Sequence, residues 1–498
     1  MTTTVHARYV LGYREGDHVL IEDASVVYDG ARIVYAGPRR DSTAGETIDL
    51  GEALVTPGLI DLDAVSDIDH ALLDSWSAPE AAASLQWSAE YFTHRRHDVF
   101  DQEERNFIRQ YGLAQLLLHG ITTCMPIASE THSSWAETYQ DAVGIAEAAR
   151  ALGIRAYVGP SYRAGVNVVR GEGGREVRWE EQRGLAGLRD AERFLEYARS
   201  SAGDGLVRGA LLPCRIETMT PELLAATAEL ARRHDVPVRL HCMQGTVELD
   251  LLRREHAATP LEIIERAGLL GCRLLLPHAT YGAGGGTRGA APSDSELETL
   301  ARAGASIVHC PSTSLRYGMV LDSFDRFGRA GVNITLGSDS FPPDLFRAMD
   351  VGSSLTKVLE GRLDAGDPAA YFRAATLNAA RALGRDDLGR LAPGAQADLV
   401  AVRLTDFRLG VLDDPLRTFL MSGSPRDIAL TVVAGRTVVR DGELPGRDVT
   451  AMQSRAQRLF GRMRAGYGER NAHRRAAADL FPPVFPRLPA GSAASEAP

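Results

Sequence analysis

Short apolar segments alternate with helical segments along the middle of the chain. The apolar run "GITTCMP" is followed by the helical "AETYQDAVGIAEAARALG" and then by the strand-like "IRAYVG". The same order returns in "GALLPC", "PELLAATAELARRHD" and "VPVRLHC". Strands that alternate with helices predict βαβ units with parallel strands. Because the repeat covers roughly 330 residues, we expect an α/β fold with a closed TIM-like (β/α)8 barrel rather than an open sheet.

Both chain ends have a different pattern. Residues 17–40, "DHVLIEDASVVYDGARIVYAGPRR", alternate apolar and polar residues between D-G and A-G turns, which predicts antiparallel strands. "GAQADLVAVRL" and "DIALTVVAGRTVVRDGEL" repeat that pattern near the other end. We expect the two ends to pair in one small β-sandwich. The expected boundaries are 1–57 and 386–450 for the two parts of the sandwich, 58–385 for the barrel, and 451–498 for a C-terminal helix with a Pro/Ala-rich tail.

Charge and cysteine content restrict the partners and the compartment. The formal net charge is −10 and the Lys and Arg residues are scattered, which argues against nucleic acid or an anionic membrane as the main partner. No run approaches the roughly 18 apolar residues of a membrane span, and the N-terminus has no apolar signal region. The five cysteines are odd in number and form no C-x-x-C, which favours a reducing compartment. We expect a cytoplasmic homodimer with a small-molecule substrate.

Polar side chains follow four predicted strands in succession. His241 ends "VPVRL", and His278 follows "CRLLLP". His309 ends "ASIV", and Asp339 follows "VNITLGS". A single histidine at a strand end is more often structural, but active sites of βα barrels lie at the carboxyl ends of the strands. Four such residues in consecutive units therefore predict an active site.

Several motifs in order resemble the amidohydrolase superfamily, in its branch of cytosine, guanine, adenosine-type and triazine deaminases and chlorohydrolases. They include "VTPGLID", "GITT", "LLLPHATY", "IVHCPSTSLRYGM", "VNITLGSDS" and "LGRLAPGAQADLVAV", and the resemblance covers about residues 17 to 470. It implies one divalent metal ion, Zn or Fe, that lowers the pKa of bound water to about 7. The hydroxide then attacks an sp² carbon that carries an amino or chloro group.

The resemblance also implies roles for individual residues. By position, His241 resembles the metal ligand after strand five. His278 resembles the histidine that handles the proton after strand six, and Asp339 the ligand and base after strand eight.

The catalytic set departs from the family pattern at four places. Asp63 and Val65 stand where a pair of histidine ligands is usual. Gln244 stands three residues after His241, in place of a glutamate that shuttles protons, and Cys214 replaces a histidine that contacts the substrate. Because the scaffold motifs are kept while these four positions change, we interpret the pattern as altered function.

Three interpretations of this site remain open. In the first, the metal is held by Asp63, His241, His278 and Asp339, since mixed histidine and carboxylate sets suit Zn or Fe. A further ligand in this interpretation would come from Asp67, Asp69 or His70. In the second, the enzyme is metal-free and uses Asp339 and His278 as acid and base. In the third, the barrel is inactive and binds a small molecule.

We expect a hydrolase that cleaves a non-peptide C–N bond of a cyclic amidine or aminated heterocycle. The predicted catalytic residues are Asp339, His278 and Gln244. Four further residues are predicted to contact the substrate: Cys214, His309, Trp87 and Arg163. Arg163 lies in the expected long loop 161–179 and suits an anionic or carbonyl-rich substrate. Trp87 suits stacking on a flat ring, and core packing is the alternative role for this side chain. For His309, the alternative is a structural role in which the segment "HCPSTS" stabilises a loop.

Overall fold

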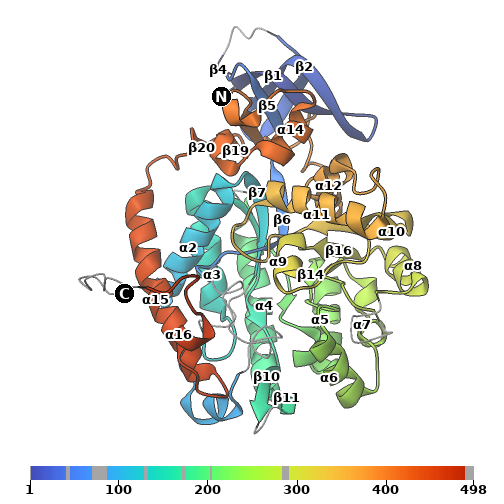
Figure 1. The fold of residues 1–498 in the computed structure, drawn as a ribbon, viewed down its shortest axis with the longest axis vertical. Coiled ribbons are helices and arrows are strands. Elements are labelled where there is room, and N and C mark those ends of the chain that lie inside the picture. Colours follow the sequence, from blue (N-terminus) through green and yellow to red (C-terminus); the bar gives the residue numbers. More distant parts are fainter. Residues whose placement is uncertain are drawn as a thin grey trace, which may run out of the picture.

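The computed structural model describes residues 2–40, 45–69, 87–127, 133–170, 174–201, 203, 205–282 and 291–487. A mixed, mostly antiparallel sheet built from both chain ends lies above a larger α/β body (Figure 1). The C-terminal helix α15 (Val449–Arg470) runs along the side of that body beside α2 (Gln102–Leu118).

Both chain ends contribute strands to one eight-stranded sheet, in the order β20-β19-β18-β5-β1-β2-β3, with β4 also paired to β1. The join is the antiparallel pairing of β5 with β18, from Leu399 opposite Pro57 to Arg403 opposite Ala53. The two ends therefore share a sheet, as expected. The strands are β1 (Thr2–Arg14), β2 (Asp17–Asp29), β3 (Arg32–Pro38), β4 (Glu46–Asp49), β5 (Ala53–Pro57), β18 (Leu399–Arg403), β19 (Ile428–Val433) and β20 (Arg436–Arg440).

The α/β body contains two four-stranded parallel sheets, in the orders β12-β8-β7-β6 and β14-β15-β16-β17. The isolated bridges Leu211–Val238 and Arg215–His241 connect the sheets at one margin, and the Asp339 N–H donates to the Asp63 carbonyl (2.8 Å) at the other. The expected parallel βα architecture is confirmed, while the ladders among the described residues form no continuous closed barrel. The strands are β6 (Leu59–Ala64), β7 (Ile121–Pro126), β8 (Arg155–Val158), β12 (Val207–Gly209), β14 (Val238–Arg239), β15 (Leu274–Pro277), β16 (Ser306–His309) and β17 (Asn333–Leu336), with β9 (Ser161–Tyr162) paired to β13 (Leu212–Pro213).

The helices between these strands have clear start and stop signals in the sequence. Helix α5 begins after Thr220, whose hydroxyl accepts the Leu223 N–H, and ends at Asp235 in the left-handed region. The remaining helices are α3 (Tyr139–Leu152), α4 (Glu181–Ser200), α5 (Pro221–His234), α6 (Thr246–His256), α7 (Pro260–Arg266), α8 (Asp294–Arg302), α9 (Pro311–Arg316), α10 (Phe324–Arg329), α11 (Leu345–Glu360), α12 (Pro368–Ala374), α13 (Leu377–Ala382), α14 (Pro415–Ser422) and α16 (Ala477–Leu480). Short turns of helix are η1 (Tyr91–Arg95), η3 (Ile216–Thr218), η4 (Leu269–Gly271), η5 (Phe407–Leu409) and η6 (Pro425–Asp427).

The segment expected to be a long loop over the top of the barrel is instead a β-hairpin. Strands β10 (Gly165–Arg170) and β11 (Gly174–Trp179) pair antiparallel. Val166 and Val168 are buried in an aromatic cluster with Trp87 and Tyr467, and Asn167 between them is half-buried. The period-2 burial of these valines provides the physical reason for a strand rather than an irregular loop.

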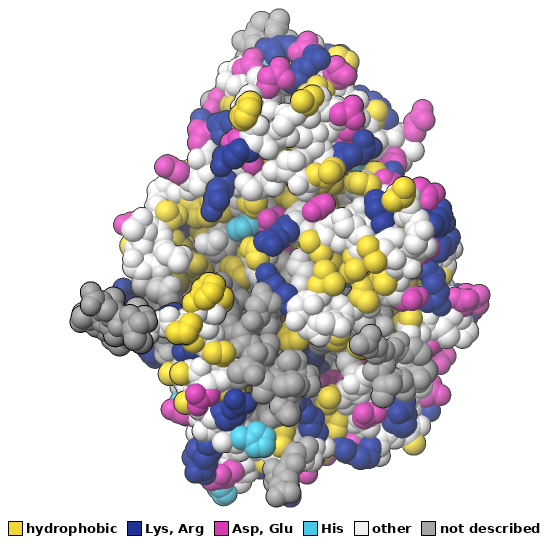
Figure 2. Space-filling view, in the orientation of Figure 1, with side chains coloured by type: hydrophobic (Ala, Val, Ile, Leu, Met, Phe, Trp, Pro, Cys, Tyr) yellow, Lys and Arg dark blue, Asp and Glu magenta, His cyan; other side chains and the backbone are white. Residues whose placement is uncertain are grey.

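The charge distribution on the surface and the polarity of the helices agree with the sequence composition. On the face drawn in Figure 2, Lys and Arg side chains are interspersed with Asp and Glu side chains. Among the residues that the structure describes, no helix combines the length and the apolar character that crossing a membrane requires. All five cysteines lie in the described part of the chain, and all five are free thiols.

Candidate active site

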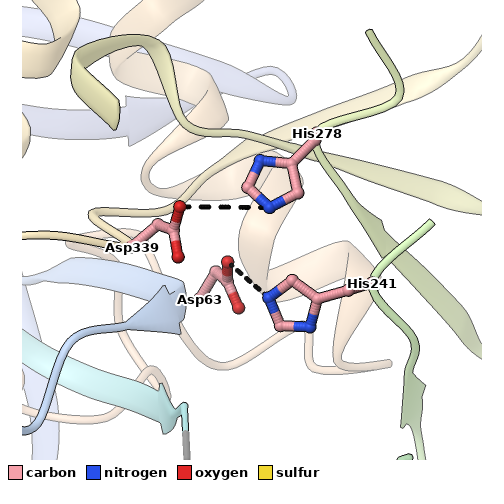
Figure 3. A group of neighbouring side chains, drawn as sticks. All are labelled: Asp63, His241, His278 and Asp339. Atoms are coloured by element: carbon pink, nitrogen blue, oxygen red, sulfur yellow. Dashed lines mark ion pairs between the residues drawn. The ribbon is translucent and has the colours of Figure 1, made fainter. Parts of the chain in front are cut away.

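Four side chains converge at the carboxyl ends of strands from both parallel sheets (Figure 3). Asp63 lies in β6, His241 follows β14, His278 follows β15 and Asp339 follows β17. One ligand-capable atom of each residue lies within 4.8 Å of those of the other three. The structure therefore brings together all four predicted metal ligands, which are separated by up to 276 positions in the chain.

The backbone of the site is held in an uncommon conformation. His278 and Asp339 have positive φ angles of 76° and 52°, which L-residues seldom adopt. Main-chain hydrogen bonds hold both residues, because the His278 N–H donates to the Val308 carbonyl (2.9 Å) and the Asp339 N–H to the Asp63 carbonyl (2.8 Å). Non-glycine residues in this region cluster at functional sites.

The orientation of His241 suits a cation at the centre. Its Nδ1 lies 3.1 Å from the carbonyl oxygen of Cys214, and because a carbonyl can only accept, this nitrogen is the protonated one in the neutral ring. The lone pair of Nε2 then faces Oδ2 of Asp63 at 3.4 Å. Two acceptors that face each other require a proton or a cation between them.

Unsatisfied polar atoms lie at the same place. Both ring nitrogens of the buried His278 and the Oδ1 atom of Asp63 have no hydrogen-bond partner among the described residues. The His278 Nε2 is 3.9 Å from Oδ2 of Asp339. Leaving a buried polar atom unpaired costs about 1–3 kcal/mol, so these atoms fit a site whose partner is a metal ion or a substrate.

The protonation of the site follows from burial and neighbouring charges. Burial and the proximity of His241 lower the pKa of His278 to about 3, so its imidazole is neutral at physiological pH. Burial alone would raise the pKa of Asp63, but the charges of Arg239 and of a protonated His241 outweigh it and hold that pKa well below its usual range. Burial and the charge of Asp63 raise the pKa of Asp339 to about 6.

Two further residues, which sequence reasoning missed, contact Asp63 in the group of four. The Arg239 guanidinium is buried, donates to the carbonyls of Met125 (2.7 Å) and Pro126 (2.9 Å), and places Nε 3.4 Å from Asp63 Oδ1. The buried Asp61 accepts the N–H groups of Asp63 and Ser338, each at 3.1 Å. Burial raises the pKa of Asp61 to about 7.

The sequence contained a signal for both of these residues. Arg239 lies two positions before His241, and Asp61 lies two positions before Asp63. Residues two apart in a strand share a face of the sheet. The alternation could therefore have identified both.

Gln244 and Cys214 lie beside the group of four rather than in it. The Gln244 side-chain oxygen accepts from the Arg215 guanidinium, and the backbone N–H of Gln244 donates to the Glu248 carboxylate (3.1 Å). The Cys214 sulfur contacts the Ser161 hydroxyl at 2.9 Å, while its carbonyl orients His241. Sequence reasoning also missed Arg215 and Glu248.

The other predicted substrate contacts are buried side chains that lie close to aromatic rings. His309 is buried with its ring centroid 6.2 Å from that of Phe324, outside the group of four. Trp87 is buried 5.6 Å from Tyr467, and Arg163 is buried with its guanidinium 5.5 Å from the Trp135 ring.

The remaining positions near Asp63 also lie outside the group. Val65 is buried, and its N–H donates to the Ser338 hydroxyl (3.1 Å). Asp67 and Asp69 are not in the group of four, and Asp69 accepts from the Tyr467 hydroxyl. His70 lies outside the described residues.

Parallel strands with His and Asp side chains converging at their carboxyl ends are an arrangement typical of the active sites of α/β enzymes. A sequence model described as "Amidohydrolase family" matches residues 54–438, and the chain belongs to this family. It is a hydrolase that acts on carbon–nitrogen bonds other than peptide bonds.

Named relatives match almost the whole chain. A protein of Halobacterium salinarum named 5-methylthioadenosine/S-adenosylhomocysteine deaminase is 28% identical over 454 residues, which cover 90% of this chain and 95% of that protein. An 8-oxoguanine deaminase of Pseudomonas aeruginosa is 27% identical over 453 residues, with coverages of 90% and 95%. The zinc-bound crystal structure of an adenosine deaminase from Xanthomonas campestris aligns with a TM-score of 0.75 at 23% identity, over 93% of this chain and 98% of that one. The structural likeness shows that the fold is shared.

Proposed function

We propose that this chain catalyses hydrolytic deamination of an aminated heterocycle at a mononuclear divalent metal centre. The proposed ligands are Asp63, His241, His278 and Asp339. The observation that supports it most strongly is the convergence of their ligand atoms within 4.8 Å, with two nitrogens and two oxygens as donors. Such a donor set suits Zn or Fe.

Each residue of the site has its own proposed role in the reaction. When bound, the metal ion supplies Lewis-acid activation of water at neutral pH. The Cys214 carbonyl fixes the His241 ring with Nε2 toward the centre. Asp339 is the proposed base, which takes a proton from the attacking water and delivers it to the leaving nitrogen, and the neutral His278 is proposed to donate its remaining ring N–H as a hydrogen bond to the reacting group.

Gln244 cannot replace a carboxylate as a proton shuttle, because its amide does not titrate near neutral pH. Its oxygen already accepts from Arg215. We assign Gln244, which the sequence predicts to be catalytic, a polar contact to the reacting group.

The substrate class is proposed from the relatives and the chemistry. The named relatives are deaminases of adenosine derivatives and of 8-oxoguanine. An exocyclic amino group on a purine-like ring, or the equivalent carbon of a cyclic amidine, fits the same reaction. Four residues remain proposed substrate contacts: Cys214, His309, Trp87 and Arg163.

A second candidate is a metal-free acid–base enzyme or a binding protein without catalysis. The ion pair between Asp63 and Arg239 favours it, since a carboxylate with a cationic partner needs no metal for charge balance. This alternative predicts activity, or ligand binding, that survives chelation.

Elemental analysis of protein purified without chelators tests the proposal first. One equivalent of Zn or Fe per chain is expected, and Asp63→Ala should lower metal content and activity together. Asp69→Asn is the matched control, because it alters a half-buried carboxyl outside the group of four and should retain the metal. If wild-type activity on adenosine derivatives or 8-oxoguanine survives exhaustive chelation, the metal-free mechanism replaces the proposal.

We further propose the domain boundaries, the location and the oligomeric state that the sequence predicts. Residues 58–385 would close as a (β/α)8 barrel, residues 1–57 and 386–450 would form the sandwich, and 451–498 the C-terminal extension. The five free cysteines support a reducing, cytoplasmic location. A homodimer is the expected assembly, which light scattering after size exclusion would measure.

A further inference from the structure

Arg239 places a fixed positive charge beside the proposed metal ligands. Its side chain is only 3% exposed. Two of its nitrogens donate to the carbonyls of Met125 (2.7 Å) and Pro126 (2.9 Å), which end β7. The head group is therefore anchored from a neighbouring strand and keeps its charge, because arginine stays protonated in proteins.

The two carboxylate oxygens of Asp63 face different partners, one toward Arg239 and the other toward the proposed metal centre. Oδ1 lies 3.4 Å from Arg239 Nε, whereas Oδ2 lies 3.4 Å from His241 Nε2. Neither Arg239 Nε nor Asp63 Oδ1 has a hydrogen-bond partner within the described part of the chain. The attraction between them is thus electrostatic and orients the carboxylate without a directional hydrogen bond.

We infer that Arg239 is the counter-charge of the metal centre, a positioning residue that offsets the carboxylate charge of Asp63 and turns its Oδ2 toward His241. This inference rests on the proposed function. With both carboxylates ionised, Asp63 and Asp339 contribute two negative charges and Arg239 one positive charge. The sum of −1 equals that of a site with a neutral imidazole at residue 63 and no arginine beside it.

The positive charge of Arg239 also affects metal affinity. A buried cation repels a divalent ion, and the effect is strong where the dielectric is low. Removing the charge of Arg239 should therefore tighten metal binding. A residue that only supports the shape of the site would have the opposite effect, since its loss would loosen the ligands.

Zinc dissociation constants measured by competition with a chromophoric chelator test this inference. Arg239→Met should bind Zn²⁺ about tenfold more tightly than wild type, a change within the range of residues that contact metal ligands. Arg239→Lys, the matched control that keeps the charge, should stay within about threefold of wild type. Asp63→Asn should bind more weakly, and the double variant Asp63→Asn/Arg239→Met should lie between the two single variants.

The outcomes separate this inference from the proposed function. Wild-type protein that binds no Zn²⁺ overturns the metal centre, and the inference with it. Wild-type protein that binds Zn²⁺ while Arg239→Met binds it equally or more weakly overturns the inference alone. If Arg239→Met fails to fold, the double variant decides, because a buried ion pair is often replaceable as a pair. It must then bind Zn²⁺ more tightly than Asp63→Asn, and equal or weaker binding rejects the inference.

Discussion

The buried ion pair between Arg155 and Asp398 should couple the terminal sheet to the α/β body. Arg155 follows α3, and Asp398 immediately precedes β18. The side chains are 2% and 4% exposed and pair through Nε to Oδ2 (3.0 Å) and Nη2 to Oδ1 (3.1 Å). Oδ1 also accepts the Ala434 N–H at 2.7 Å, so one carboxylate links three segments.

Removing Asp398 leaves the Arg155 charge buried without its partner, which costs about 3–5 kcal/mol. Unfolding entropy is about 2.1 cal/mol/K per residue. For 498 residues it is therefore about 1 kcal/mol/K, and Asp398→Ala should lower the melting temperature by about 3–5 °C.

Differential scanning calorimetry measures this shift. The matched control is Asp364→Ala, which removes an exposed bidentate partner of Arg362 and should leave the melting temperature unchanged. The double variant Arg155→Met/Asp398→Leu should recover part of the loss. An unchanged melting temperature for Asp398→Ala would refute the coupling.

Three further variants test the site and its surroundings. His241→Ala should abolish activity with an unchanged melting temperature; a collapsed melting transition would instead assign His241 a structural role. Burial and the neighbouring Glu217 raise the pKa of Glu248 to about 8, so the folded state binds more protons than the unfolded state between pH 4.5 and about 8. Stability therefore falls as the pH rises through that window, and Glu217→Gln should make the fall in melting temperature between pH 6 and 8 smaller; an unchanged slope would contradict the pairing of these carboxyls. Burial lowers the pKa of His309 from 6.5 to about 3, so the folded state binds fewer protons than the unfolded state between these values. Stability should then fall by about 1.4 kcal/mol for each pH unit below 6.5, and His309→Phe should melt with a shallower pH dependence between pH 7 and 5; an equal dependence would show that this histidine does not titrate on unfolding.

The sequence alone determined the positions of the chemistry. The alternation of strands and helices placed His241, His278 and Asp339 at strand ends, and the motif around residue 57 identified Asp63 as a substituted ligand position. Strand ends can be predicted because hydrophobic periodicity and helix caps are local signals. Parallel strands in one architecture then bring their carboxyl ends to one face, so the convergence of these four residues followed from the fold class.

Only the tertiary structure decided which partner each of these side chains has. Asp63 pairs with Arg239, Gln244 accepts from Arg215, and Asp69 accepts from Tyr467 at a separation of 398 positions. The hairpin at 165–179 also differed from the expected loop, because the packing of alternate valines outweighed its glycine content. The period of a strand shows which face a side chain occupies, but its contacts depend on the neighbouring strand. The charge balance of the site is a sum over residues distant in the chain, so it becomes visible only when those residues are placed in space.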